Sequence, residues 1–150
     1  MAIKRHESLQ AFSRDHHQAL LLCWKIKVGL SKGISINRIK TYTNWFYENH
    51  ILEHFEMEEK YMFPVLPKNN ELIIKVLGEH KLLLALFNNT SQVEKSLREL
   101  YVALKNHIRF EERILFNEIQ NVASQSQLDV IEKHHTSEKF KDNLNDVFWK

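Results

Sequence analysis

Glycine and proline, the residues that most often interrupt helices, are scarce in this chain. Its 150 residues include 3 glycines and 2 prolines, and both prolines fall within residues 63–67. Long stretches on either side are therefore free of helix-breaking residues. With 43% hydrophobic residues, the composition fits a globular protein with its own core rather than a disordered chain. We expect a single domain over residues 1–150, built of long helices.

A second cysteine, a dominant charge and long apolar runs are also missing. Cys23 is alone, so the chain forms no internal disulfide, and we interpret Cys23 as a reduced core thiol. A formal net charge of +2, with acids and bases mixed along the chain, provides no basic face for nucleic acid and no polybasic segment for anionic lipid. No apolar signal segment is visible, and no stretch approaches the roughly 18 apolar residues of a membrane span. We therefore expect a cytoplasmic protein that binds neither nucleic acid nor a membrane.

Apolar residues recur at three- and four-residue steps in four segments, which predicts four helices at about residues 9–30, 36–63, 73–87 and 97–115. Gly33 and Ser35 mark the first turn, and Pro64 and Pro67 end the second helix. A fifth helix is expected at about residues 126–148. It would pack on the outside or at one end of the other four through Leu128, Ile131, Leu144, Val147 and Phe148.

Histidine is abundant, with 9 copies, and each of the four helices places one on its apolar face. Two helices add a glutamate four residues later, about 40° around the helix, whereas the fifth residue lies about 140° away. Glu58 and Glu111 are therefore favoured as inward residues, and Glu59 and Glu112 are interpreted as solvent-side charges. A buried imidazole needs a hydrogen-bond partner or a metal. The candidate metal ligands are His16, His54, Glu58, His80, His107 and Glu111.

The expected turns place these four histidines at one height. In antiparallel neighbours, two side chains at the same height lie equally far from the turn between them. The midpoint of His16 and His54 is residue 35, in the first turn. The midpoint of His54 and His80 is residue 67, in the second turn, and that of His80 and His107 falls in the polar stretch 91–96. All four therefore fit one layer of an all-α, up-down-up-down four-helix bundle over about residues 7–120, with the additional C-terminal helix outside it.

An internal repeat supports one shared site. Residues 54–63 and 107–116 both fit His-x3-Glu-Glu-x3-Phe, and an acid-His pair precedes a leucine-rich stretch at both 15–16 and 79–80. Two helix hairpins, each contributing one histidine and one His-x3-Glu pair, would meet about an approximate two-fold axis. Four imidazoles and two carboxylates suit two iron, manganese or zinc ions, with the carboxylates bridging and coordination positions left open.

The other histidines are weaker candidates. His50 lies one turn before the second-helix ligand, and three roles stay open for it: an additional metal ligand, a hydrogen-bond donor to a ligand, or a residue at the rim. His6, His17, His134 and His135 are most simply exposed.

The combined pattern resembles the hemerythrin-like family, in which an early Asp-His is followed by His-x3-Glu-Glu ending in Phe-Pro, a lone Glu-His and a second His-x3-Glu-Glu. The resemblance covers about residues 9–116. It implies a non-haem di-iron centre that engages oxygen or a related small oxidant, with the same six ligands. The family's oxygen carriers have two histidines four residues apart on the third helix, where Val76 and Leu84 flank His80 here. Their last carboxylate follows its histidine by five residues rather than four, so both departures argue against reversible oxygen carriage.

Three functions are consistent with these residues. The first is a sensor or buffer whose metal pair engages oxygen, peroxide, nitric oxide or iron, with a protein partner that the sequence does not identify. The second is a di-iron enzyme that consumes peroxide or acts as an oxidase, with Tyr61 and Tyr101 nearby on the helices that carry candidate ligands. The third is a helical interaction protein without metal. We predict two metal ions per chain, iron first, with manganese or zinc as alternatives.

Overall fold

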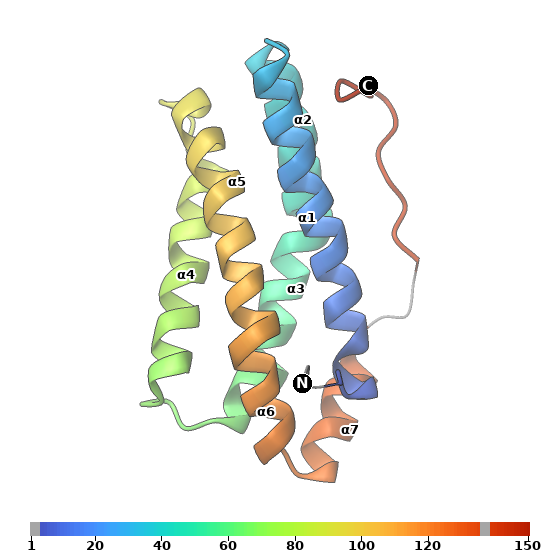
Figure 1. Ribbon diagram of the computed structural model, residues 1–150, viewed down its shortest axis with the longest axis vertical. Helices are drawn as coiled ribbons and strands as arrows, with labels where there is room; N and C mark the ends of the chain where they lie inside the picture. Colours follow the sequence, from blue (N-terminus) through green and yellow to red (C-terminus); the bar gives the residue numbers. More distant parts are fainter. Residues whose placement is uncertain (1–3, 136–138) are drawn as a thin grey trace.

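A computed structural model describes residues 4–135 and 139–150, and within these residues it is all-helical, without strands. The long helical segments lie side by side along the molecule (Figure 1). None of the helices in the described ranges is long and apolar enough to cross a membrane. The elements, including two 3-10 stretches (η1 and η4) and three π-helical stretches (η2, η3 and η5), are η1 (Glu7–Leu9), α1 (Gln10–Ser31), α2 (Ile36–Phe46), η2 (Tyr47–Ile51), α3 (Leu52–Met57), η3 (Glu58–Met62), η4 (Phe63–Val65), α4 (Glu71–Asn88), α5 (Val93–Phe110), η5 (Glu111–Leu115), α6 (Phe116–Val122) and α7 (Gln125–His134).

Local sequence sets where these helices begin and end. Gly33, just beyond α1, has a φ of 69°, in the left-handed region that favours glycine. The Asn70 side chain caps α4 by accepting a hydrogen bond from the Leu72 N–H at 2.8 Å. The short turns 32–35 and 66–70 therefore lie where the sequence predicts them. The third turn, 89–92, comes slightly earlier than the polar stretch 91–96, because α5 already begins at Val93.

Two buried apolar clusters lie on either side of the histidine layer. On α1, Phe12 belongs to the first cluster and Ala19 to the second, with His16 between them. On α4, Val76 and Leu83 flank the layer in the same way. Side chains from all the long segments fill both clusters, so the polar layer is enclosed by hydrophobic packing above and below.

Three apolar residues within the predicted helical stripes are exposed instead. Leu20 on α1 is 37% exposed, Leu77 on α4 is 41% exposed and Ile114 in η5 is 51% exposed. A π-helical turn holds more residues than an α-helical turn, so η5 changes which side chains face inward. Leu77 lies at the edge of its stripe, where the neighbouring Val76 takes the buried position.

The predicted C-terminal helix is wrong beyond His134. The helix α7 ends there, residues 136–138 lie outside the described part, and residues 139–150 are not helical. We call residues 139–150 the C-terminal strap. It runs beside α1 toward the end of the molecule at which α2 begins (Figure 1). Of the apolar residues assigned to the helix, Leu144 is 67% exposed, whereas Phe148 is 2% exposed.

Long-range contacts hold the strap in place and explain why its helical spacing is misleading. Asp142 accepts hydrogen bonds from Lys25 Nζ at 2.6 Å and from Tyr42 Oη at 2.5 Å. Arg38 pairs with Asp146 at 2.7 Å. The Phe148 ring joins the second apolar cluster, so a local pattern is overridden by contacts with α1 and α2.

We predict that Gly29→Ala destabilises the protein. A Cβ at Gly29 would lie 2.8 Å from Phe148 Cε1 and 2.9 Å from Ile39 Cδ1, and both of these side chains are buried. The free energy of unfolding should fall by about 1–3 kcal/mol in chemical denaturation, as expected for overpacking. The matched control is Gly78→Ala on the exposed face of α4, where a Cβ meets nothing within 4 Å. That change should raise stability by about 0.5–1 kcal/mol; equal gains for both variants would contradict the close contact with the strap.

Candidate metal centre

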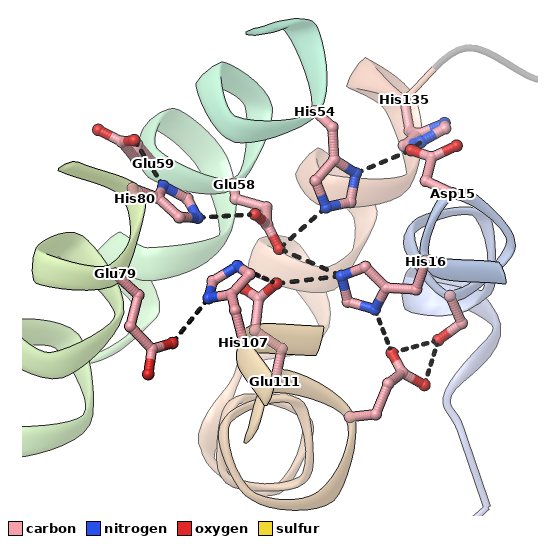
Figure 2. A network of polar contacts seen from close by, with 12 residues as sticks. Asp15, His16, His54, Glu58, Glu59, Glu79, His80, His107, Glu111 and His135 are labelled. Atoms are coloured by element: carbon pink, nitrogen blue, oxygen red, sulfur yellow. Dashed lines mark hydrogen bonds and ion pairs between the residues drawn. The ribbon is translucent and has the colours of Figure 1, made fainter. Parts of the chain in front are cut away.

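Six buried side chains from four long helical segments converge in one layer (Figure 2). None is more than 6% exposed, and both glutamates are 0% exposed. They are His16 on α1, His54 on α3, Glu58 at the start of η3, His80 on α4, His107 on α5 and Glu111 at the start of η5. The structure therefore brings together all six candidate ligands predicted from the sequence.

Each carboxylate lies between two imidazoles. Glu58 Oε2 is 3.3 Å from His54 Nε2, and Glu58 Oε1 is 3.3 Å from His80 Nε2. Glu111 Oε1 is 3.0 Å from both His16 Nε2 and His107 Nε2. The ligand atoms form two groups of four that share both glutamates, and within each group all atoms lie within 4.8 Å of one another. Each group could hold one metal ion.

The other ring nitrogen of each histidine contacts a second set of acids, which we call the outer carboxylates: Asp15, Glu59, Glu79 and Glu112. The Nδ1–carboxylate distances are 2.7–2.9 Å, in the pairs His16–Glu112, His54–Asp15, His80–Glu59 and His107–Glu79. An Nδ1–H that donates to a carboxylate leaves Nε2 with its lone pair toward the cluster. Four such pairs orient all four imidazoles as inward-facing ligands.

The outer carboxylates follow the two-fold repeat of the sequence. The acid before each lone histidine, Asp15 or Glu79, binds the histidine of the following long segment. The second acid of each Glu-Glu pair, Glu59 or Glu112, binds a lone histidine. Glu59 is exposed and Glu112 partly exposed, as solvent-side charges would be, but the interpretation missed that both also contact candidate ligand histidines. The angular argument correctly excluded them from the inner layer but did not consider that they reach a neighbouring helix.

Many of the cluster's inward atoms have no hydrogen-bond partner. Within the described residues, the buried side-chain atoms without one include Nε2 of His54, His80 and His107, both carboxylate oxygens of Glu58, and Glu111 Oε2. Buried polar groups are almost always paired, because burying one without a partner costs free energy. Lone pairs that face one another at 3.0–3.3 Å need positive charge between them. The donor atoms therefore fit metal cations, and imidazole with carboxylate suits divalent transition metals.

In the absence of metal, protons supply that positive charge. Burial, together with the neighbouring Glu111, raises the pKa of Glu58 to about 8. Burial opposes protonation of His107, but Glu111 and Glu79 outweigh it and raise its pKa to about 10. The imidazoles that contact Glu111 hold the pKa of this carboxyl below its ordinary value, although burial acts in the opposite direction. The cluster can therefore bind either protons or metal ions.

Two of the π-helical turns begin at the inner glutamates. Glu58 opens η3 and Glu111 opens η5, so both His-x3-Glu motifs pass directly into a widened turn. The side chain of Glu58 is 0% exposed, whereas that of the next residue, Glu59, is 43% exposed and reaches α4. Such π-turns are often found at functional sites. The spacing of apolar residues contained no signal for them.

The remaining histidines have several different environments. His17 and His134 are exposed as expected, and His134 stacks on Tyr61 with ring centroids 4.0 Å apart. His135 is not exposed: its side chain is 8% exposed and its Nε2 lies 2.6 Å from Asp15 Oδ2. The sequence missed this contact because it depends on where α7 packs. His6 is partly buried and accepts a hydrogen bond from the backbone N–H of Ser8.

A cavity of about 130 Å³ adjoins the cluster. His16, His54 and Glu111 contribute to its inner end, and the strap residue Phe140 contributes to its wall. His50 also lines the cavity, belongs to neither group of four, and lies among the rings of Trp45, Phe46 and Phe140. Of the three roles left open for His50, this position fits a residue at the rim.

Comparisons of the chain with protein-family models, curated proteins and solved structures find no match. The fold and the site themselves define the class: an all-helical protein with buried His/Glu groups that could hold metal ions.

We predict that the metal-free protein loses stability between pH 7 and pH 9. The folded-state pKa values of Glu58 and His107, about 8 and about 10, lie above their ordinary values of 4.5 and 6.5. Their contribution to stability is therefore present at low pH and lost as pH rises through the folded values. Thermal unfolding by circular dichroism should show a falling Tm across this range. A constant or rising Tm would contradict a cluster held together by protons.

Proposed function

We propose that this chain is a non-haem dinuclear metal protein of the hemerythrin-like type. In this proposal an up-down-up-down four-helix bundle binds two metal ions. Iron is the favoured metal, and manganese and zinc are the alternatives. The ligands are His16, His54, Glu58, His80, His107 and Glu111, and the centre senses or buffers oxygen, peroxide, nitric oxide or iron. The observation that carries the proposal is the set of inward lone pairs without partners in a fully buried layer.

Two ions are favoured over one by the shape of the ligand set. A structural zinc ion takes four ligands, whereas six candidate ligands meet here in two groups that share both carboxylates. Shared carboxylates suit bridging between two cations. Cys23, the only thiol in the chain, lies in the second apolar cluster, so the donors are nitrogen and oxygen alone. This donor set suits iron and manganese and also accepts zinc.

A bound iron pair would supply redox-active cations with coordination positions open to a small oxidant. The protein's own contribution is orientation and exclusion of water. The outer carboxylates keep each Nε2 directed inward, and such partners typically raise the basicity of the ligand. The two apolar clusters enclose the layer, so access is expected through the adjoining cavity rather than along the helices.

Metal analysis tests the proposal directly. Protein loaded with ferrous iron should contain about two ions per chain, and its Tm should exceed that of the metal-free protein, because a ligand that binds only the folded state stabilises it. Glu58→Ala and Glu111→Ala each remove a shared carboxylate and should reduce the content to about one ion or fewer. One firmly bound ion in the parent protein, or equal Tm values with and without metal, would refute a dinuclear centre.

The outer carboxylates supply a second test. Glu59→Ala and Glu112→Ala should each weaken metal affinity by about 10–100-fold, the usual effect of removing an acid that orients a ligand histidine. Glu56→Ala on the exposed face of α3 is the matched control and should leave affinity unchanged. Competition with a metal chelator measures all three. If both outer variants behave like the control, the contacts to His80 and His16 do not orient ligands.

A di-iron enzyme is the second candidate, and the adjoining cavity favours it because a substrate could reach the cluster. Tyr61 stacks on His134, and neither Tyr61 nor Tyr101 lines the cavity, so the tyrosines lend this candidate no support. Catalytic turnover of hydrogen peroxide by iron-loaded protein distinguishes the enzyme from a sensor or buffer. Stoichiometric reaction without turnover favours the sensor.

A further inference from the structure

The cavity beside the cluster is larger than a small oxidant requires. A single water molecule needs about 10–15 Å³ of such space, and dioxygen or peroxide needs little more. The cavity measures about 130 Å³. An engineered protein cavity of about 150 Å³ lined by leucine, isoleucine and phenylalanine binds benzene. The space therefore matches one six-membered ring.

The lining of the cavity is divided into apolar walls and polar ends. The walls comprise Phe46, Ile51, Phe55, Leu104, Ile108 and Phe140, of which all except Phe140 are buried. The inner end is formed by the cluster, and exposed Glu53 and Lys139 stand at the outer end. Three aromatic rings in the wall suit edge or face contact with another ring.

The lining of the cavity favours a neutral occupant over an ion. Asp15, Glu53 and Glu111 contribute carboxylates to its ends, whereas Lys139 and the imidazoles of His16 and His107 bring positive charge there. The ends therefore select neither sign of charge, and an ion would lose its hydration against the apolar walls. A neutral ring loses little on entry, and a single hydroxyl group on it can contact the polar inner end.

We propose that this cavity binds a neutral, single-ring organic molecule of the size of phenol. The position of the ring beside a metal centre rests on the proposed function; binding in the cavity does not. The strap supplies part of the site, because two lining residues, Lys139 and Phe140, belong to the strap. The wall is therefore complete only while the strap packs on α1 and α2.

Calorimetric titration with phenol, benzene and benzoate tests the proposal on metal-free and zinc-loaded protein. Phenol should bind saturably to both forms at one site per chain, and benzene more weakly. In the metal-free form benzoate should bind more weakly than phenol, because its charge loses hydration against the apolar walls. Because the metal-free form is included, failure of the cavity to bind is distinguishable from failure of the chain to bind metal. No saturable binding of phenol, or tighter binding of benzoate than of phenol to the metal-free protein, would overturn the proposal.

Two variants locate the binding. Ala19→Met places a flexible side chain into the cavity from α1, where Ala19 is 5% exposed, and should weaken phenol binding about tenfold or more. Ala85→Met, the same change on the exposed face of α4, should leave binding unchanged. Phe140→Ala removes part of the wall from the half-buried strap and should also weaken binding, which keeps the test open if Ala19→Met misfolds. Unchanged binding in Phe140→Ala and in folded Ala19→Met would place phenol elsewhere and overturn the proposal.

Discussion

The structure depends on one electrostatic constraint, the burial of imidazole nitrogens and carboxylate oxygens that face one another. Glu111 Oε1 lies 3.0 Å from two Nε2 atoms, and both glutamates are fully buried. Without positive charge between them, these lone pairs repel and remain unsolvated. Protons or metal ions must therefore occupy the layer. The outer carboxylates add to this requirement, because each keeps an imidazole in the orientation that presents a lone pair to the centre.

The two Glu-Glu pairs show how a short motif can supply both a candidate metal ligand and a hydrogen-bond partner for a ligand histidine. In each Glu-Glu pair, the first glutamate lies four residues after a histidine on the same face and enters the layer, whereas the second points to a neighbouring helix. Glu58 thus contacts His54 and His80 inside the layer, while Glu59 contacts the opposite nitrogen of His80. One dipeptide serves both nitrogens of a single imidazole. The repeat at residues 111–112 does the same for His16, so the geometry follows the internal symmetry of the chain.

The six inner residues were predictable from the sequence because helical periodicity is local and the turns are marked by Gly33 and the prolines. Contacts between helices were less accessible. His135 meets Asp15 only because α7 packs against the end of the molecule, and the strap is held by Lys25 and Tyr42, far away in sequence. The π-turns left no trace in apolar spacing, since a single extra residue per turn is within the scatter of any stripe. Local patterns therefore predicted the inner layer, whereas long-range packing determined the outer contacts and the cavity.

The arrangement of the core explains why such a polar layer is tolerable. Burying the layer costs free energy, and the apolar clusters on either side of it offset that cost. Each fully buried leucine, isoleucine or phenylalanine contributes about 1.5–3 kcal/mol, and both clusters contain many of them. The clusters are also unequal in their connections: only the second includes Phe148 of the strap. The cavity lies beside the second cluster, and strap residues form part of its wall. A small molecule that reaches the layer through this cavity therefore passes a segment without helical structure. A few long-range contacts hold that segment in place.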